Sequence, residues 1–444
     1  MTTQSEKTIT SSAMAALAAI RNRDVSVEEL TNIFQERIEA ENANIGALSN
    51  VMAESALKRA KKIDEKLGKG EAIGPLAGLP FVVKENCDIE GISCSAGLNF
   101  RNDHIPHSNA WITQKLIDSG AILIGQSVSD PGAFDVKTEA VTHPIDPKLS
   151  VGGSSGGSAA ALAANMALGA IGTDTGGSIR IPAACCGIVG LKPTFGALPM
   201  DGIFPLVQSL DHVGPMARSV EDVDLIWSAI SNQQPSQVDL PKSVGIDPKW
   251  IGETDVEIQK QTGNLLTLFS DLGIEVVEIE MPDLNEICDM HMNIFVVENA
   301  AFHLAHYSEH RERYPPIAKL GFDLVDDMSV GEYVRNCKLR VEFTKQINHI
   351  FEKTDFLINP TLAVHQPVRA VDTLTIAGAV KNFTAAMVRH TCLFDHTGHP
   401  TLAMPMGSTD STIPSSIQLI GKFGKESDIM NFGKVLEQTY LKKM

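Results

Sequence analysis

Two serines lie in glycine-rich segments that suit nucleophilic chemistry. The first is Ser154, within the run Gly-Gly-Ser-Ser-Gly-Gly-Ser at residues 152–158, and the second is Ser178, 24 residues later, directly after a Gly-Gly step. Two glycines before a serine let several consecutive backbone N–H groups point at one place, as an oxyanion hole requires. Ser178 is therefore a candidate nucleophile.

The glycine-rich run at residues 152–158 also resembles a phosphate-binding loop. It lacks the lysine of the GxxxxGK[ST] motif and the spaced glycines of GxGxxG. Taken alone, the run is better explained as a glycine-rich turn that caps a helix beginning near Ser158. The pattern does not favour nucleotide binding.

A serine nucleophile needs a base, and the local histidines, His143 and His212, belong to no recognisable triad motif. A lysine can replace the histidine in a Ser–Lys arrangement. Lys84 is the candidate, because it ends the apolar run at residues 79–83. Burial at the end of a strand lowers the pKa of a lysine toward the range of a usable base.

Three separated motifs that contain these residues resemble the amidase signature family. They are Leu-Ala-Gly-Leu-Pro-Phe-Val-Val-Lys-Glu-Asn at 76–86, the run at 152–158, and Gly-Thr-Asp-Thr-Gly-Gly-Ser-Ile-Arg at 172–180. The resemblance continues through Ile-Pro-Ala at 181–183, Gly-Leu-Lys-Pro-Thr at 190–194, Gly-His-Pro at 398–400 and Gln-Leu-Ile-Gly at 418–421. It covers nearly the whole chain except a central segment.

By this resemblance Lys84, Ser154 and Ser178 form a Ser–cis-Ser–Lys triad, with Ser178 as nucleophile and Ser154 as the bridging serine on a cis peptide bond. Neutral Lys84 would take a proton from Ser154, which would take one from Ser178 and later return it to the departing nitrogen. An acyl-enzyme on Ser178 would then be hydrolysed by water. The oxyanion would be held by the backbone N–H groups of Thr175, Gly176, Gly177 and Ser178.

Three more residues are expected to support this site. Asp174 and Arg180 flank the nucleophile, and an apolar, glycine-rich neighbourhood favours a buried ion pair between them. Ser155 follows the bridging serine. Asp395, just before His396, stands where the resemblance usually places a neutral asparagine, and the sequence suggests only a contact with substrate for it.

The segments that must position these residues alternate between helix and strand. A capping box begins at Ser26, and helices are expected at 30–38, 54–67, 111–119 and 158–168. Strands are expected at 79–83, 121–125, 356–358, 401–404 and 416–420. The alternation predicts an α/β fold with a mixed, mostly parallel sheet. The resemblance implies one large α/β/α sandwich over residues 1–444, interrupted by a variable helical cap at about 235–345.

The composition excludes several classes of protein. With 43% hydrophobic and 20% charged residues, the chain is not a disordered protein. The 37 Lys and Arg against 54 Asp and Glu leave a net charge of −17, which repels nucleic acid and anionic membranes. No signal peptide or membrane-spanning stretch is visible, so a cytoplasmic location is expected.

Neither the cysteines nor the histidines predict a metal site. The seven cysteines are odd in number, scattered and without a CxxC pair, which favours reduced thiols. His303, His306 and His310 share one helical face but lack the HExxH form, so a solvated or substrate-lining face is preferred. We expect no cofactor and no metal.

We expect an amidase that hydrolyses the C–N bond of a small carboxylic amide to an acid and ammonia or an amine. The alternative is the ammonia-producing A subunit of a tRNA-dependent amidotransferase. In that subunit glutamine typically follows Ser-Ile-Arg, whereas this chain has Ile181 and is short. A catalytically inactive binding relative is disfavoured because all three triad positions are present. The expected partner is a small amide, not nucleic acid or membrane, and a homodimer stays open.

Overall fold

An eleven-stranded mixed sheet lies at the centre of the computed structural model, which describes residues 4–231, 233, 240–406 and 413–443. Its strands follow the order β1-β3-β2-β4-β6-β5-β12-β13-β9-β7-β8. Their bounds are β1 Leu48–Val51, β2 Pro80–Lys84, β3 Ile122–Ser127, β4 Gly169–Asp174, β5 Val189–Lys192, β6 His212–Ala217, β7 Ser243–Ile246, β8 Glu275–Glu278, β9 Phe356–Pro360, β12 Thr401–Met406 and β13 Ser415–Ile420. A separate hairpin consists of β10 Thr373–Ile376 and β11 Ala379–Asn382.

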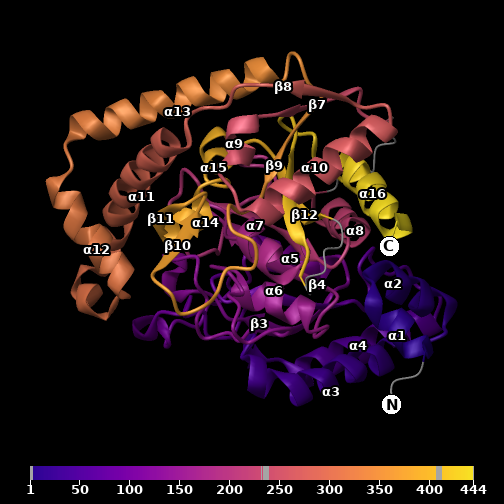
Figure 1. Cartoon of the computed structure of the whole chain (residues 1–444). Helices are drawn as coiled ribbons and strands as arrows, with labels where there is room; N and C mark the ends of the chain where they lie inside the picture. Colours follow the sequence, from indigo (N-terminus) through magenta and orange to yellow (C-terminus); the bar gives the residue numbers. More distant parts are fainter. Residues whose placement is uncertain (1–3, 232, 234–239, 407–412, 444) are drawn as a thin grey trace.

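Helices surround this sheet (Figure 1). They are α1 Gln4–Ser11, α2 Ala13–Asn22, α3 Val27–Ile45, α4 Ala53–Gly68, α5 Trp111–Asp118, α6 Gly156–Ala163, α7 Arg180–Cys186, α8 Val220–Ser231, α9 Pro248–Gly252, α10 Val256–Asp271, α11 Leu284–Tyr307, α12 Pro316–Leu324, α13 Val330–Ile350, α14 Phe383–Val388, α15 Leu393–Thr397 and α16 Glu426–Lys443. Short 3-10 segments lie at Asn99–Arg101, Pro131–Ala133, Ser308–Arg313 and Val325–Asp327. None of the described helices is both long and apolar enough to cross a membrane.

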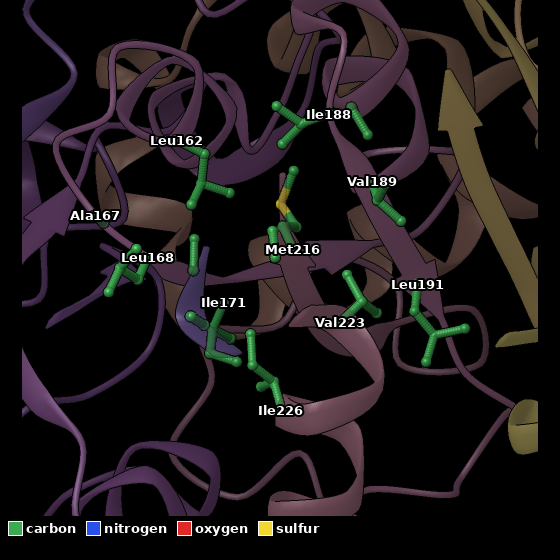
Figure 2. Packing of buried hydrophobic residues seen from close by; sticks show 14 of the residues in the cluster. Leu162, Ala167, Leu168, Ile171, Ile188, Val189, Leu191, Met216, Val223 and Ile226 are labelled. Atoms are coloured by element: carbon green, nitrogen blue, oxygen red, sulfur yellow. The ribbon is translucent and has the colours of Figure 1, made fainter. Parts of the chain in front are cut away.

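Apolar side chains pack on both faces of the central strands. Ile171 of β4 and Met216 of β6 are fully buried. Leu162 of α6 lies on one side of these strands, and Val223 and Ile226 of α8 lie on the other (Figure 2). In agreement, α6 contacts β2 and β4, while α8 contacts β4, β5 and β6. The centre of the sheet is thus covered by helices on each face, which confirms the predicted α/β fold.

The expectation of a mostly parallel sheet is wrong. Of the ten pairings between described strands of the large sheet, six are antiparallel and four are parallel. A parallel neighbour needs a crossover connection, whereas an antiparallel one does not. The connection from β5 to β6, residues 193–211, contains no helix, and the two strands pair antiparallel. Because helix and strand signals alternate elsewhere in the chain, the sequence did not indicate this change of strand direction.

Most of the predicted elements are confirmed at their centres. The strands expected from the sequence correspond to β2, β3, β9, β12 and β13. At the start of α3, Ser26 Oγ accepts the N–H of Glu29 at 3.1 Å, and Glu29 Oε2 accepts the N–H of Ser26 at 2.9 Å, so the capping box is present. The helix expected at 158–168 ends earlier, because the chain turns at Asn165, whose φ is 56°.

The helical cap is smaller than the range 235–345 expected for it. Residues 243–278 build the sheet edge with β7, β8, α9 and α10, and β7 pairs with β9 of the main sheet. Residues 235–239 lie outside the described residues. The helical layer begins at Leu284, where α11, α12 and α13 lie together at one side of the molecule (Figure 1). Four-residue strands such as β7 and β8 are too short to give a clear periodic signal.

Truncating Ile171 to alanine tests the packing that holds β4 in place. Ile171→Ala removes a fully buried side chain and is expected to lower the free energy of unfolding by about 2–5 kcal/mol. Val380→Ala on β11 is the control, because Val380 is 69% exposed and its loss is expected to cost about 0.5 kcal/mol or less. Urea unfolding of both variants measures the difference. Equal unfolding midpoints would contradict the central position of β4.

Candidate active site

The three expected triad residues come from separate segments that meet at one edge of the sheet. Lys84 is the last residue of β2, Ser154 precedes α6, and Ser178 lies in the turn between β4 and α7. β2 and β4 pair in parallel, so their carboxyl ends lie at the same edge. Both α6 and α7 begin near that edge. Lys84 and Ser154, 70 residues apart in the chain, are brought into side-chain contact in this way, and Ser178 is linked to the Ser154 loop through its backbone.

Lys84 is fully buried and has two hydroxyl partners. Its Nζ lies 2.7 Å from Ser154 Oγ and 2.8 Å from Thr173 Oγ1. Burial lowers the pKa of Lys84 to about 8, although the nearby carboxyls of Asp130 and Asp174 oppose the shift. The shift increases the unprotonated fraction of Lys84 near neutral pH, where the protonated amine still predominates.

The backbone links the segment of Ser154 to that of Ser178. The Gly153–Ser154 peptide bond is cis. The next residue, Ser155, donates its N–H to Ser178 O at 3.2 Å and its hydroxyl to Thr173 O at 3.2 Å. A Cβ on Gly153 would lie 2.7 Å from the carbonyl carbon of Val136, so only glycine fits there. Ser155 thus links the loop of Ser154 to that of Ser178 by hydrogen bonds.

The turn that carries Ser178 is organised by the Asp174 carboxylate. That carboxylate accepts the N–H groups of Gly177 at 2.6 Å, Ile179 at 3.1 Å and Arg180 at 3.3 Å. The N–H of Gly177 is therefore engaged, which corrects the expectation that it helps to hold the oxyanion. Gly177 has another role: its φ of 131° and the 2.3 Å between an added Cβ and Thr391 Oγ1 require glycine.

Asp174 and Arg180 form a buried, bidentate ion pair. Arg180 Nε lies 3.0 Å from Asp174 Oδ2, and Nη2 lies 3.0 Å from Oδ1. Neither side chain is exposed to solvent. Burial alone would raise the pKa of Asp174, but the guanidinium beside it holds that pKa below its usual range. The carboxylate stays ionised and continues to accept the three backbone N–H groups of the turn.

Arg180 also contacts Asp395. Its Nη2 donates to Asp395 Oδ2 at 2.7 Å, and its Nη1 donates to Thr391 O and Gln418 Oε1, each at 2.8 Å. Burial and the neighbouring Asp174 charge raise the pKa of Asp395 well above its usual range. The raised pKa favours the uncharged form of Asp395, which has the same charge as the asparagine of the resemblance. Asp395 is not among the described residues that line the cavity at Ser178.

A cavity of about 340 Å³ opens onto the nucleophile turn, with Thr175, Gly176 and Ser178 in its wall. Its other described lining residues come from the segment 133–136, the loop between β5 and β6, α11, α12 and the region of α14. They are Ala133, Phe134, Asp135, Val136, Leu206, His291, Met292, Phe295, Val296, Asn299, Ile317, Ala318, Leu320, Gly321, Leu324, Asn382, Thr384, Ala385 and Val388. The wall is mainly apolar, and among these residues there is one carboxylate and no lysine or arginine.

The histidines at 303, 306 and 310 serve structural contacts. His303 is buried, and its Nδ1 lies 3.0 Å from the hydroxyl of Tyr314. His310 stacks on the ring of Phe100 with centroids 4.7 Å apart. Among the described residues, no three His, Cys, Asp or Glu side chains are grouped as a metal site. Both His303 and His310 lie outside the lining of the cavity.

Sequence reasoning missed several residues that the structure brings to the site. Thr173 contacts Lys84, and Thr391 donates its hydroxyl to Gly176 O at 2.6 Å. His291 lines the cavity beside Gly176 and contacts His396. Thr391, His291 and His396 are more than 100 residues from the nucleophile, and no local motif marks them. Only the position of Thr173 within the motif at 172–180 could have drawn attention.

The chain is similar to known proteins in sequence and in fold. A family model described as Amidase matches residues 29–430. The chain is 31% identical to the A subunit of the glutamyl-tRNA(Gln) amidotransferase from Caldanaerobacter subterraneus, over 95% of this chain and 94% of that protein. A crystal structure of an amidase superposes with a TM-score of 0.91 at 28% identity, covering 97% of this chain and 100% of its own. Another structure comes from a vestigial protein complex related to the evolutionary origins of an s-triazine catabolic enzyme. It superposes with a TM-score of 0.89 at 30% identity, covering 96% of this chain and 98% of its own.

Replacing Arg180 by methionine tests the ion pair under the nucleophile turn. Arg180→Met leaves the Asp174 charge buried without its cation and is expected to lower the free energy of unfolding by about 3–5 kcal/mol. Asp395→Asn is the matched control: the raised pKa of Asp395 favours an uncharged acceptor, which asparagine can replace at an expected cost of about 1 kcal/mol. Chemical unfolding of the two variants measures both effects. An equally large loss in Asp395→Asn would mean that Asp395 is charged.

Proposed function

Because the chain belongs to the amidase family, we propose that it hydrolyses the C–N bond of a small carboxylic amide with an apolar acyl group. The products are a carboxylic acid and ammonia or an amine. The family and the amidase-like structure support a hydrolase that acts on carbon–nitrogen bonds. The finer proposal rests mainly on the contact of the buried Lys84 Nζ with Ser154 Oγ, at 2.7 Å. The loop that carries Ser154 is hydrogen-bonded to the backbone of Ser178, and Ser178 lines the cavity.

In this proposal Ser178 is the nucleophile. Its oxygen forms a bond to the amide carbon while its proton passes to Ser154, and the Ser154 proton passes to neutral Lys84. The C–N bond then breaks, and the nitrogen leaves with a proton returned through Ser154. Water attacks the resulting ester on Ser178 by the same route in reverse and releases the acid. The sequence of steps requires neither a cofactor nor a metal ion.

Backbone amides near Ser178 provide the electrostatic part of the proposal. The oxyanion of the tetrahedral intermediate is assigned to the N–H groups of Thr175, Gly176 and Ser178, with Gly177 left out because Asp174 holds its N–H. Such donors act when charge develops on the carbonyl oxygen, so they accelerate the chemical step. Asp174, Arg180 and Ser155 support the turn without touching the substrate.

The cavity favours an apolar, uncharged or cationic substrate over an anionic one. Asp135 is its one charged lining group among the described residues, and Asp135 Oδ1 accepts hydrogen bonds from Thr384 Oγ1 at 2.6 Å and from Val136 N at 2.8 Å. A substrate carboxylate would normally be met by arginine or lysine. None lines this part of the described wall, and the net charge of −17 adds to the repulsion.

The absence of lysine and arginine from the described cavity lining also argues against the alternative, the ammonia-producing component of an amidotransferase. Glutamine, the ammonia donor in that reaction, carries a carboxylate that the cavity does not match. The two sequence arguments against the amidotransferase component, Ile181 and the length of the chain, are weaker than this observation. The Ile181 side chain is fully buried and does not line the cavity, and the chain covers 94% of the Caldanaerobacter relative, so its length does not discriminate. An inactive binding relative is disfavoured by the contact between Lys84 and Ser154.

We further propose that the enzyme works in the cytoplasm without a nucleic acid or membrane partner. The net charge of −17 opposes binding to phosphate-rich surfaces. The cysteines among the described residues are all free, as a reducing compartment would keep them. The proposal leaves open whether the chain is a monomer or a homodimer. The mass of the protein in solution distinguishes these two states.

The purified chain alone should release ammonia from primary amides such as hexanamide and phenylacetamide, and much more slowly from glutamine. Ser178→Ala should lower kcat about 10⁴-fold or more and abolish labelling by a fluorophosphonate, whose adduct maps to Ser178. Cys185→Ala is the control, because burial raises the pKa of the Cys185 thiol and makes it a poor nucleophile. Activity that appears only with a second polypeptide would instead indicate the amidotransferase component.

The pH profile should report the state of Lys84. Activity requires the neutral amine, so kcat/KM should rise with pH and level off above about 8, where Lys84 loses its proton. Lys84→Ala should lower kcat about 10²–10⁴-fold, and Lys84→Arg should not restore it because a guanidinium stays protonated.

A second buried lysine provides the control for that profile. Lys192 has its pKa lowered to about 7 by burial but contacts Pro193 O and His212 instead of Ser154. Lys192→Gln should keep the ascending limb of the profile at the same pH. Near-native turnover in Lys84→Arg, or loss of the limb in Lys192→Gln, would show that Lys84 is not the base.

A further inference from the structure

A pair of buried histidines lies at the wall of the cavity next to the nucleophile turn. His291 comes from α11 and His396 from α15, and both are less than 10% exposed. His291 Nδ1 lies 3.0 Å from His396 Nε2, and the two rings are nearly perpendicular, at 84° with centroids 5.2 Å apart. The proton-relay serines and Lys84 do not use this pair.

The other edge of the His291 ring faces the turn. A Cβ built on Gly176 would lie 3.0 Å from both His291 Cε1 and His291 Nε2. Gly176 is a member of the proposed oxyanion site, and His291 lines the same cavity as Ser178. The Nε2 atom is therefore a polar atom of the ring placed beside Gly176, one of the residues whose backbone N–H is assigned to the oxyanion.

Both rings are neutral near neutral pH. Burial lowers the pKa of His291 to about 4 and that of His396 well below its ordinary value, where the neighbouring His291 and Arg340 add to the effect. Two neutral imidazoles in contact share one hydrogen between Nδ1 of His291 and Nε2 of His396. The position of that hydrogen decides what the pair presents to the cavity.

The free nitrogen of His396 indicates where the hydrogen lies. His396 Nδ1 is buried and has no hydrogen-bond partner among the described residues. A buried N–H without a partner is rarer than a buried acceptor without one, so the hydrogen of His396 belongs on Nε2. His396 then donates to His291 Nδ1, and His291 carries its own hydrogen on Nε2, directed to the cavity side.

The oxyanion site has room for this donor. The N–H of Gly177 is held by Asp174 at 2.6 Å, so the turn offers one backbone donor fewer than its sequence suggests. A neutral imidazole N–H can polarise a carbonyl as a backbone amide does. On the side of Gly176 where a Cβ would stand, the His291 ring is the nearest described group.

We propose that His291 is a catalytic residue that donates its Nε2–H to the substrate carbonyl oxygen as that oxygen gains negative charge. His396 is the positioning residue that fixes the tautomer of His291. The inference rests on the proposed amide hydrolysis and adds a side-chain donor to its oxyanion site. The donor acts on the transition state, so its removal lowers kcat and leaves KM nearly unchanged.

Steady-state kinetics with hexanamide tests the donor. His291→Phe should lower kcat about 10²–10³-fold with KM changed less than about threefold, and His291→Gln, which keeps an N–H donor, should recover part of the loss. The matched control is His303→Gln. His303 lies on the same helix and is equally buried, but it contacts Tyr314 and does not line the cavity. Its kcat should stay within about threefold of the parent.

The positioning role of His396 has its own pair of variants. His396→Gln retains an N–H that can donate to His291 Nδ1, whereas His396→Leu has none. Only the leucine variant should lose kcat, by about tenfold, with KM retained, because His291 can then adopt the other tautomer. Equal losses in both variants would assign His396 a packing role and overturn that part of the proposal.

An inhibitor that mimics the tetrahedral state provides a readout besides turnover. A trifluoromethyl ketone with the hexanoyl group adds to Ser178 and places an oxyanion in the same site. Its inhibition constant should rise in His291→Phe by the factor by which kcat falls. Unchanged inhibition and kcat, in a variant whose thermal unfolding midpoint matches the parent, would overturn the proposal, as would a change in KM alone.

The two proposals fail in different ways. If Ser178→Ala is inactive and His291→Phe is fully active, the amidase stands and the donor role of His291 does not. If the parent enzyme hydrolyses no amide, the proposed function fails. The rate of fluorophosphonate labelling at Ser178 then still reports on His291, since the phosphoryl oxygen occupies the same site, and an unchanged rate in His291→Phe would overturn the donor role too.

Discussion

The buried ion pair of Asp174 and Arg180 is the interaction on which the rest of the site depends. A single carboxylate holds three backbone N–H groups of the nucleophile turn, and one guanidinium balances its charge. The same guanidinium extends to Asp395, Thr391 and Gln418, which lie on other elements across the sheet. Neither charge could be buried alone, so turn and sheet are held together as one unit.

Burial acts differently on the carboxylate of Asp174 and on the amine of Lys84. Around Asp174 it is offset by a cation, and the carboxylate stays ionised. Around Lys84 it is not fully offset, and the pKa falls to about 8 with hydroxyl groups as the hydrogen-bond partners. One apolar environment therefore yields a permanent charge that shapes the turn and an amine that can be neutral when substrate arrives. The difference comes from what lies within hydrogen-bond distance of each group.

The chemistry and the selectivity belong to different parts of the fold. The proposed relay of Lys84, Ser154 and Ser178 lies near the carboxyl ends of β2 and β4, whereas the cavity wall is formed largely by α11, α12 and the region of α14. Among the described lining residues the wall offers apolar surface, one carboxylate and no cation, which matches neutral acyl groups. His291 is the point where the two parts meet, because it comes from α11 and its ring lies beside Gly176 of the turn. A change of acyl specificity and a change of rate can therefore be coupled through this helix.

Local sequence determined the parts of this protein whose cause is local. The capping box at Ser26, the strand that ends at Lys84 and the Gly-Gly step before Ser178 follow from neighbouring residues, and so they could be predicted. The direction of strands such as β5 and β6, the engagement of Gly177 by Asp174, the raised pKa of Asp395 and the pairing of His291 with His396 could not. Each of these depends on groups that are distant in the chain or on burial, and burial and contact arise only when the sheet and its helices have packed.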